Sequence, residues 1–378
     1  MLYLWTMKRW ILVIWVWVAV CGQRAQEGQR AQEGQRVQEE QRGEIGRRAQ
    51  IGQSGRLEQD TLRVMFWNLE NFFDNRNDST STSDAEFSSY GERHWSRKKF
   101  NTKCQAIAKG ILWTAGEKGG LPDVIGVAEV ENKRALQRLL YNTALHKLDY
   151  KIIHFESPDP RGIDVALLYR TSRLRLLHAK PCHLYKADST IIRTRDILLS
   201  EFVQPDGTPV AFLVNHHPSK YGGAAVSEPR RKIAVDRLKQ VADSLQAAGT
   251  EYIVAMGDFN ETPANPLYKR LEPTLRNLAE SLHQKGLGTI KYDGAWELID
   301  LFFVSPKVHT KGMEIVTIPF LQTADGSHAG RKPLRTYSGP RYIGGVSDHC
   351  PIWLEISPLA PLGRNDKNVI PSVVEEYH

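Results

Sequence analysis

Short apolar runs of five to eight residues recur along the chain and limit its possible folds more than any other feature. Runs of this length, bounded by polar and turn-forming residues, are typical of buried strands. Three longer stretches, at 102–115, 133–145 and 228–246, have helical patterns, and Ser227 with Pro229 indicates where the third helix starts. About ten strands with helices between them predict an α/β sandwich rather than a helical bundle or a pure β-barrel. The predicted strands are 63–68, 123–130, 150–155, 164–169, 196–203, 210–215, 252–256, 298–304, 313–318 and 351–356.

The composition excludes several classes of protein. Of the 378 residues, 41% are hydrophobic and 25% are charged, which excludes a collagen-like, a mostly disordered or a polytopic membrane protein. The four cysteines form no CxxC pair, so neither a zinc finger nor a small disulfide framework is expected. The net charge of +7 permits a polyanionic partner without requiring one.

Residues 1–21 have the pattern of an export signal. Two basic residues precede an apolar run at 10–20, which is too short to cross a bilayer because a spanning helix takes about twenty residues. Cys21 follows a segment that resembles a bacterial lipobox, apart from Val20 directly before it. A lipidated Cys21 would tether the protein to a membrane, and ordinary signal cleavage is the alternative. We therefore expect an exported protein that is periplasmic, anchored to the outer membrane as a lipoprotein, or secreted.

The segment at 22–61 differs in composition from the rest of the chain. It contains the hexapeptide AQEGQR twice, at 25–36, and then VQEEQR at 37–42. Such polar, charge-balanced repeats cannot bury a core, so we expect a disordered tether. The globular domain is predicted at 62–358, followed by a loosely held polar tail at 359–378.

Polar side chains follow several of the predicted strands at the point where each strand ends. The apolar strand 252–256, for example, leads directly into the sequence GDFN. Strand ends collect at one edge of a packed sheet, where functional residues are usually found. Six segments show this pattern, and their polar residues are Asn68, Glu129, His216 with His217, Asp258 with Asn260, Asp300, and Asp348 with His349.

Each of these residues has an ordinary structural explanation when it is taken alone. GDFN can form a turn, Glu129 or its neighbour Glu131 can face solvent, and His216 and His217 point in opposite directions on a strand. Asp300 is harder to explain, because it lies inside the apolar run LIDLFFV. Burying an acid there is costly unless it is paired, and we expect a histidine as its partner. As a set, in this order, the residues indicate function.

The chemistry that suits these residue types is phosphate-ester hydrolysis. Carboxylate and amide oxygens are the ligands of hard divalent cations such as Mg²⁺, which also binds substrate phosphate. No Cys/His cluster offers the nitrogen and sulfur ligands typical of zinc. A carboxylate beside an amide can activate water, and histidines held by acids can stabilise the charge that develops on the phosphoryl oxygens.

The chain resembles the endonuclease/exonuclease/phosphatase superfamily, and in particular a group of exported bacterial members. This resemblance implies a deoxyribonuclease-I-like fold, a four-layer αββα sandwich, with one metal-dependent catalytic site in the domain at 62–358. The paired motifs GDFN and SDHxPI, in this order and spacing, are highly specific. The motifs that carry the resemblance are FWNLENFFD (66–74), GVAEVEN (126–132), DVALLYR (164–170), VNHHPSKYGG (214–223), MGDFNETP (256–263), LIDLFFV (298–304) and VSDHCPI (346–352).

The resemblance implies a metal side of the site. Glu129 is the principal ligand, with Asn68 beside it, and Asp348 belongs to the same side. The ion implied is Mg²⁺, with Mn²⁺ as the alternative. Glu129 is preferred to Glu131, although Ala-Glu-Val stands here where the family usually has Gln-Glu-Val.

The resemblance also implies a phosphate side. Asp258 orients or deprotonates the attacking water, and Asn260 holds both Asp258 and the scissile phosphate. His349 stabilises the pentacovalent phosphate or acts as general acid or base, and Asp300 fixes its tautomer. His216 is preferred to His217 as the second histidine that faces the phosphate.

The superfamily contains nucleases, sphingomyelinases and inositol phosphatases, so the shared site does not choose a substrate. The basic stretch at 319–346, which includes Arg331 and Arg335, and also Lys220 would suit a phosphate backbone, although a solvated loop is the ordinary alternative. We see no exposed aromatic hairpin that would enter a membrane, which disfavours a sphingomyelinase. We expect a monomeric, exported, Mg²⁺-dependent nuclease acting on nucleic acid or another phosphodiester. The alternatives are a phosphatase or phospholipase-type enzyme acting on phosphorylated lipids or inositol phosphates, and a non-catalytic binding module.

Overall fold

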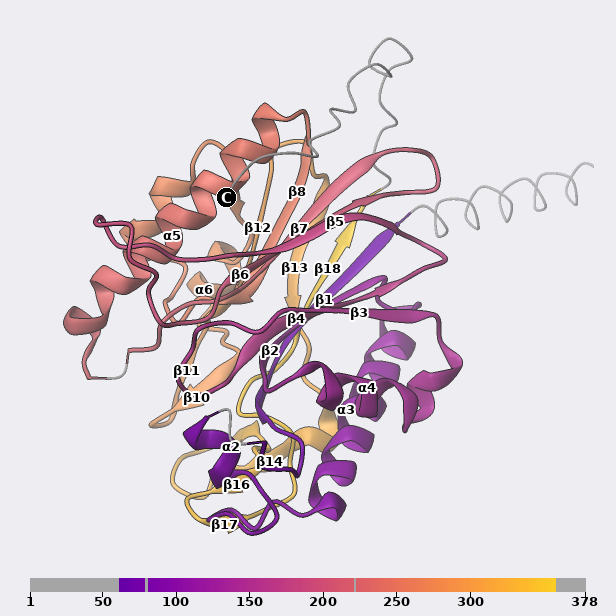
Figure 1. Ribbon diagram of the computed structural model, residues 1–378, viewed down its shortest axis with the longest axis vertical. Helices are drawn as coiled ribbons and strands as arrows, with labels where there is room; N and C mark the ends of the chain where they lie inside the picture. The colour runs from indigo at the N-terminus through magenta and orange to yellow at the C-terminus, as the bar shows by residue number, and fades with distance from the viewer. Residues whose placement is uncertain (1–60, 79–80, 221, 358–378) are drawn as a thin grey trace, which may run out of the picture. The chain divides into compact units, whose positions relative to one another are not determined.

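A computed structural model describes residues 61–78, 81–220 and 222–357. The expected signal, tether and C-terminal tail lie outside these residues. The described residues form two six-stranded sheets, several helices and three small two-stranded ribbons (Figure 1).

The first sheet has the strand order β13-β18-β1-β2-β4-β3, and β1 and β2 at its centre run parallel. The remaining neighbours in this sheet are antiparallel. Alternate residues of β1 face opposite layers: Val64 and Phe66 pack toward the second sheet, and Met65 and Trp67 pack toward helices. Its strands are β1 (Leu62–Phe72), β2 (Val124–Val130), β3 (Tyr150–His154), β4 (Asp164–Arg170), β13 (Thr310–Ile315) and β18 (Ile352–Ile356).

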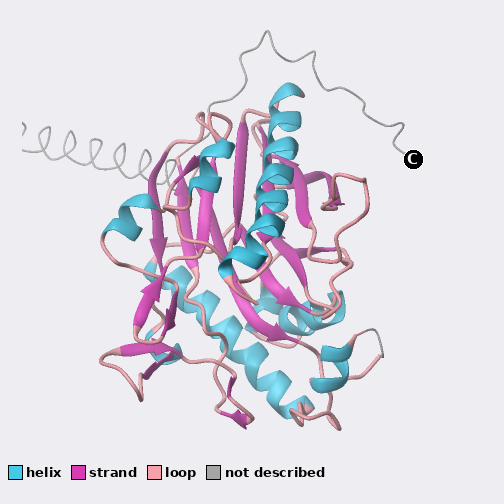
Figure 2. Ribbon diagram, turned by 90° about the vertical axis from the view of Figure 1, so that its left-hand side faces the viewer, coloured by secondary structure: helices cyan, strands magenta, loops and turns pink. Residues whose placement is uncertain are grey.

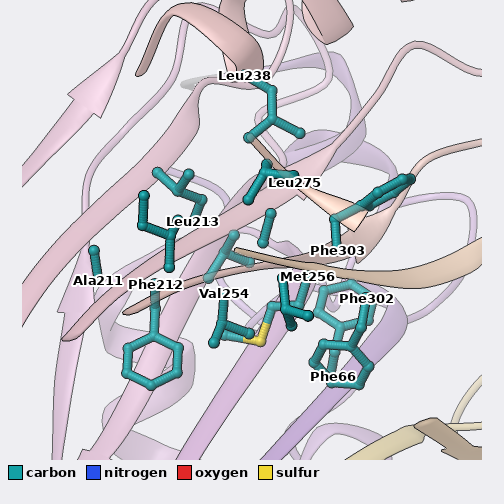
Figure 3. Packing of buried hydrophobic residues seen from close by; sticks show 14 of the residues in the cluster. Phe66, Ala211, Phe212, Leu213, Leu238, Val254, Met256, Leu275, Phe302 and Phe303 are labelled. Carbon is teal, nitrogen blue, oxygen red and sulfur yellow. The ribbon is translucent and has the colours of Figure 1, made fainter. Parts of the chain in front are cut away.

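The second sheet has the order β5-β6-β7-β8-β12-β9 and contains the parallel pair β7 and β8. The apolar core lies between the two sheets and includes Phe66 of β1, Met256 of β8 and Phe302 of β12 (Figure 3). Its strands are β5 (Arg175–Cys182), β6 (Ile197–Val203), β7 (Pro209–His216), β8 (Tyr252–Asp258), β9 (Arg276–Asn277) and β12 (Asp300–Val304).

The sheets approach closely at Gly126 of β2. A Cβ atom on this glycine would lie 2.9 Å from the Met256 Sδ atom of β8, which is closer than real Cβ contacts occur. A larger residue at 126 would therefore have to displace the end of the Met256 side chain.

Helices cover the outer face of each sheet, and Figure 2 separates them by colour from the strands that they cover. α3 (Arg97–Glu117) and α4 (Lys133–Tyr141) pack on the first sheet through residues such as Ile107 and Leu136, and α5 (Ala224–Ala247) packs on the second. The layer order helix, sheet, sheet, helix is the expected four-layer αββα sandwich. Shorter elements are α2 (Thr82–Glu86), α6 (Glu280–Gln284), η1 (Ala144–Lys147), η2 (Pro266–Leu271), η3 (Pro319–Leu321), and the ribbons β10 (Ile290–Tyr292) with β11 (Ala295–Glu297), β14 (Gln322–Ala324) with β15 (Arg331–Pro333), and β16 (Tyr337–Ser338) with β17 (Arg341–Tyr342).

All ten predicted strands occur with shifted ends, but β5 and the two-residue strand β9 of the second sheet were not predicted. Half of the β5 residues are exposed at the edge of the sheet and only Cys182 is buried, so β5 lacks the apolar run that marks a buried strand. The predicted start of α5 was also wrong. The helix begins at Ala224, and Pro229 lies inside it. Gly223, directly before the helix, has a φ of 108°, which favours glycine. The predicted helix at 133–145 ends at Tyr141.

Two further findings concern the part of the chain that the structure describes. No helix there has the length and apolar character needed to cross a membrane. Cys104, Cys182 and Cys350 are buried free thiols, so no disulfide links these described cysteines.

Candidate active site

The two parallel strand pairs bring their carboxyl ends to the same edge of the sandwich. In the first sheet β1 carries Asn68 and β2 carries Glu129, and in the second sheet β7 ends at His216 and β8 ends at Asp258. Asp258 lies opposite His216 in the parallel register and opposite Asp300 in the antiparallel register with β12. The fold thus gathers polar residues that are far apart in the sequence.

Asn68 joins the two sheets at this edge. Its amide Nδ2 donates to Asp258 Oδ2 at 3.0 Å and to Glu129 Oε1 at 3.4 Å, while its Oδ1 accepts the backbone N–H of Glu70 at 2.9 Å. In this orientation Asn68 bridges the two carboxylates rather than turning its oxygen toward the space beside Glu129. Its predicted role as a metal ligand stays a prediction.

Glu129 is positioned by an irregularity in the sheet. The pairing of β2 with both of its neighbours shifts at this residue, and its φ is +59°, in the left-handed region that non-glycine residues rarely adopt. A bulge of this kind redirects a side chain and is frequent beside active sites. The Glu129 Oε2 atom accepts the backbone N–H of Asn71 at 2.8 Å. Glu131, the alternative ligand, instead accepts the backbone N–H of Asp74 and does not join the cluster of Asn68 and Asp258.

Asp258 is almost fully buried, and this burial, together with the charges of Asp300 and Glu129, raises its pKa to about 7 against the opposing effect of His349. Its Oδ1 accepts the backbone N–H of Asn260 at 2.9 Å, and the Asn260 side chain donates to the His217 carbonyl at 3.0 Å. The backbone of Asn260 therefore orients Asp258, and the predicted contact of its side chain with the phosphate stays a prediction. A carboxylate with a pKa near 7 can gain and lose a proton at neutral pH.

His349 forms the expected pair with Asp300. Its Nδ1 lies 2.7 Å from Asp300 Oδ2, and its Nε2 lies 3.9 Å from both Asp258 Oδ2 and Asp348 Oδ1. Burial alone would lower the pKa of His349, but Asp300 and the other acids outweigh burial and hold it well above its ordinary value. The charged imidazolium is therefore the stable form near neutral pH, with Nε2 directed toward Asp258.

The neighbouring histidines on β7 face different surroundings. His216 Nε2 lies 3.6 Å from Asp258 Oδ2 and 4.0 Å from Glu129 Oε1. The His217 ring packs edge-on against Phe259 with centroids 4.7 Å apart, and neither ring nitrogen has a partner among the described residues. Burial, followed by the nearby Arg195, lowers the pKa of both, to about 3 for His217. His216 faces the cluster and His217 faces the core, as the alternation along a strand requires.

Comparison with known proteins agrees with this architecture. A family model described as the Endonuclease/Exonuclease/phosphatase family matches residues 63–358. The chain belongs to this family. No curated protein matches the chain in a sequence search.

Solved structures share the fold at low sequence identity. An endonuclease/exonuclease/phosphatase family protein from Bacteroides thetaiotaomicron has a TM-score of 0.52 and 18% identity, covering 79% of this chain and 98% of its own. The human Nocturnin catalytic domain with bound sulfate has a TM-score of 0.52 and 19% identity, covering 79% and 94%. A mannosyl-6-phosphatase of B. thetaiotaomicron has a TM-score of 0.51 and 17% identity, covering 78% and 99%. Membership of the family identifies this chain as a phosphoesterase.

This family member also has a buried network beside the site that the sequence analysis missed. Lys103 of α3 is fully buried, and its Nζ donates to the Glu70 carbonyl and, at 2.8 Å, to Thr336 Oγ1. Burial lowers the pKa of Lys103 to about 8, and burial followed by the charge of Asp348 raises that of Glu70 to about 7. One signal was available in the sequence, because Lys103 falls on the apolar stripe of its helix beside Phe100 and Ile107.

The basic residues proposed for phosphate binding are not a free cationic surface. Arg335 donates to Glu70 at 2.7 Å and to Asp348 at 3.1 Å, so it is at the site but already paired with two acids. Lys220 lies 3.2 Å from Glu261. Arg331 donates to a backbone carbonyl on its own ribbon, and the segment at 319–346 contains two ribbons rather than one long loop. The expected basic face is thus largely neutralised by local ion pairs.

An exposed aromatic ribbon is present, contrary to expectation. Tyr292 of β10 is 74% exposed and Trp296 of β11 is 36% exposed. The ribbon is anchored to the site, because Thr289 accepts the backbone N–H of Asp300 through its hydroxyl and that of Cys350 through its carbonyl. A three-residue strand is too short to show a pattern in the sequence, so this ribbon was not predicted.

The donor set fits a hard divalent cation. Glu129 is partly exposed beside the buried Asp258, and ligand atoms of Asp258, Asp300 and His349 lie within 4.8 Å of one another. Carboxylate oxygens such as these are the ligands that hard divalent cations prefer. Glu129 and Asp348, the predicted ligands, have side chains that are 16% and 40% exposed, and their role in holding such an ion stays a prediction.

Proposed function

We propose that this phosphoesterase is an exported, Mg²⁺-dependent nuclease that cleaves phosphodiesters by attack of an activated water. The observation that carries the hydrolytic part is the buried arrangement of Asp258 between Asn68 and His349, with Asp300 behind the histidine. This arrangement supplies a base and an imidazolium on either side of one reacting centre.

Each residue of the chain has a defined part in the proposed reaction. Asp258 accepts the proton of the attacking water, and the amide of Asn68 keeps its Oδ2 oriented. The Nε2–H of His349 stabilises charge on the phosphoryl oxygens or donates a proton to the leaving group, because Asp300 holds the other ring nitrogen. His216, whose pKa is depressed, acts as an uncharged hydrogen-bonding group. When bound at Glu129, Mg²⁺ would supply electrophilic stabilisation of the phosphate.

The aromatic ribbon favours a nucleic-acid substrate. Tyr292 and Trp296 lie on opposite faces of the ribbon, since their cross-strand partners are Ala295 and Lys291. Exposed aromatic rings next to a hydrolytic site are suited to stacking on bases of single-stranded nucleic acid. Export is proposed from the signal-like segment at 1–21, and fractionation of cells that produce the full chain tests it.

The second candidate is a phosphatase or phospholipase-type enzyme that acts on phosphorylated lipids or inositol phosphates. It is favoured by the pairing of Arg335 and Lys220 with acids, which leaves little free positive charge for a long phosphate backbone.

One substrate panel distinguishes these functions. The full chain is incubated with single-stranded DNA, plasmid DNA, RNA, bis-p-nitrophenyl phosphate, p-nitrophenyl phosphate, inositol phosphates and sphingomyelin vesicles, in Mg²⁺, Mn²⁺ or EDTA. We expect nucleic-acid cleavage that EDTA abolishes and that Asp258→Asn lacks. Turnover confined to monoesters or lipids would establish the second candidate, and no turnover of any substrate would indicate a non-catalytic module.

A further inference from the structure

A second group of acids lies outside the active-site cluster, at the start of the connection that follows β1. Ligand oxygens of Asp78, Asp84 and Glu131 lie within 4.8 Å of one another. Asp74 joins the group, because its backbone N–H donates to Glu131 Oε2 at 2.7 Å. The group brings together the end of β1, the short helix α2 and the residue after β2.

The two buried acids of this group, Asp84 and Glu131, form no ion pair among the described residues. Arg134 pairs with Asp74 and, at 3.3 Å, with Asp78. Asp84 and Glu131 are 1% and 3% exposed, and the Oδ1 of one and the Oε1 of the other have no hydrogen-bond partner among the described residues. Two buried carboxyl groups with ligand oxygens within 4.8 Å of each other are costly unless a cation or a proton lies between them.

We propose that Asp78, Asp84 and Glu131 bind a calcium ion at a structural site separate from the catalytic centre. All candidate ligands are oxygens, which excludes the nitrogen- and sulfur-preferring transition metals as the natural occupant. The ligands come from a connecting segment and a strand end rather than from a rigid octahedral frame. Ca²⁺ accepts irregular arrangements of six to eight oxygens, whereas Mg²⁺ demands near-ideal octahedral geometry.

The site would tie two catalytic strands together. Asp74 follows β1, which carries Asn68, and Glu131 follows Glu129 by two residues on the chain of β2. An ion held by Asp78 and Asp84 of the connection after β1 and by Glu131 would neutralise these acids and fasten the connection to the end of β2. Its expected effect is on stability, so the test does not depend on the substrate or on catalysis.

Glu131→Gln is the most informative variant, because its expected effect on Tm differs between the calcium-free and the calcium-bound protein. The glutamine amide can donate to the Asp84 oxygen that now lacks a partner, so the calcium-free variant should be at least as stable as calcium-free wild type. The calcium-induced rise in Tm should be lost. In wild type after EGTA treatment, Ca²⁺ at about 100 times its Kd should raise Tm by about 5 °C.

Matched variants complete the experiment, with Tm from thermal unfolding and bound Ca²⁺ from equilibrium dialysis of the full chain. Asp78→Asn, at an exposed position, should weaken Ca²⁺ binding by about tenfold or more. Glu92→Gln, an exposed acid outside the group, should leave the calcium response unchanged. Glu129→Gln should also keep the rise in Tm, because the stabilising ion lies elsewhere.

Three results would overturn the proposal. Wild type that shows no calcium-induced rise in Tm would mean that Asp84 and Glu131 share a proton instead of a cation. A rise that persists in both Glu131→Gln and Asp78→Asn would place the ion at another site. A rise that is lost in Glu129→Gln and kept in Glu131→Gln would assign it to the catalytic centre.

Discussion

The two halves of the candidate site differ in their access to water. On the side of the first sheet, the side chains of Glu129, Asp348 and Arg335 are 16%, 40% and 49% exposed. On the side of the second sheet, those of Asp258 and Asp300 are only 3% and 1% exposed. A hydrated cation has to enter and to keep some of its waters, which requires an open half. Groups that exchange protons near neutral pH need shifted pKa values, which burial supplies.

The largest effect is expected in the buried half, from Asp258→Asn. Removing the base should lower kcat by about 10³-fold or more without loss of folded protein. The hydrolysis rate and the circular dichroism spectrum of the variant test this expectation. Activity within tenfold of wild type would show that the buried half does not contain the base.

The same variant has a signature in stability. The pKa of Asp258 is raised from 3.8 to about 7 in the folded state, so the folded protein binds this proton more tightly than the unfolded chain does. Its contribution to the free energy of unfolding is therefore present at low pH and is lost as the pH rises from about 4 to about 7. Urea unfolding of wild type and Asp258→Asn across this range should show the wild-type decline reduced in the variant.

Asp300→Asn should have the next largest effect, because it acts through His349. We expect kcat/KM to fall by about 10²- to 10³-fold. Loss of the acid removes the charge that stabilises the imidazolium, so the pKa of His349 falls and the alkaline limb of the pH–rate profile moves to lower pH. A uniform fall in rate with an unmoved limb would contradict this coupling.

Glu129→Gln tests the open half and should produce a different kind of defect. The concentration of Mg²⁺ needed for half-maximal activity should rise by about 10- to 100-fold, and higher Mg²⁺ should restore part of the rate. Metal titrations at two pH values separate this defect from a change in proton transfer. A shift of the pH profile without a change in metal dependence would remove the distinction between the halves.

The smallest effect is expected from His217→Phe, the matched control for His216→Phe. The His217 ring already packs against Phe259, and neither ring nitrogen has a partner among the described residues. Activity should stay within about twofold, and the free energy of unfolding should rise by about 1 kcal/mol, because the unsatisfied nitrogens are removed. His216→Phe should instead reduce activity strongly. Equal losses of activity in His216→Phe and His217→Phe would contradict the orientations assigned to the two histidine rings.

Features of the site that depend on a short stretch of sequence were predicted correctly. The acid inside LIDLFFV required a buried partner, and Asp300 does pair with His349. The strands that carry Asn68, Glu129 and Asp258 were also predicted, because apolar runs are visible along the chain, although β1 continues past Asn68 to Phe72.

The parts that sequence reasoning missed depend on contacts between distant segments. The pairing of Arg335 with Glu70 joins residues that are 265 positions apart. The local sequence of the basic segment therefore does not show that an acid neutralises Arg335. The bulge at Glu129 arises from its pairing with two other strands and leaves no mark in the local sequence.

The glycine on β2 has a consequence for hydrolysis itself. Gly126 precedes Glu129 by three residues, and the methionine that fills its empty side-chain position, Met256, precedes Asp258 by two. A larger residue at 126 would first have to displace this thioether. Only a shift of the β8 backbone that followed would reach Asp258, from inside the core and two residues away from the carboxylate.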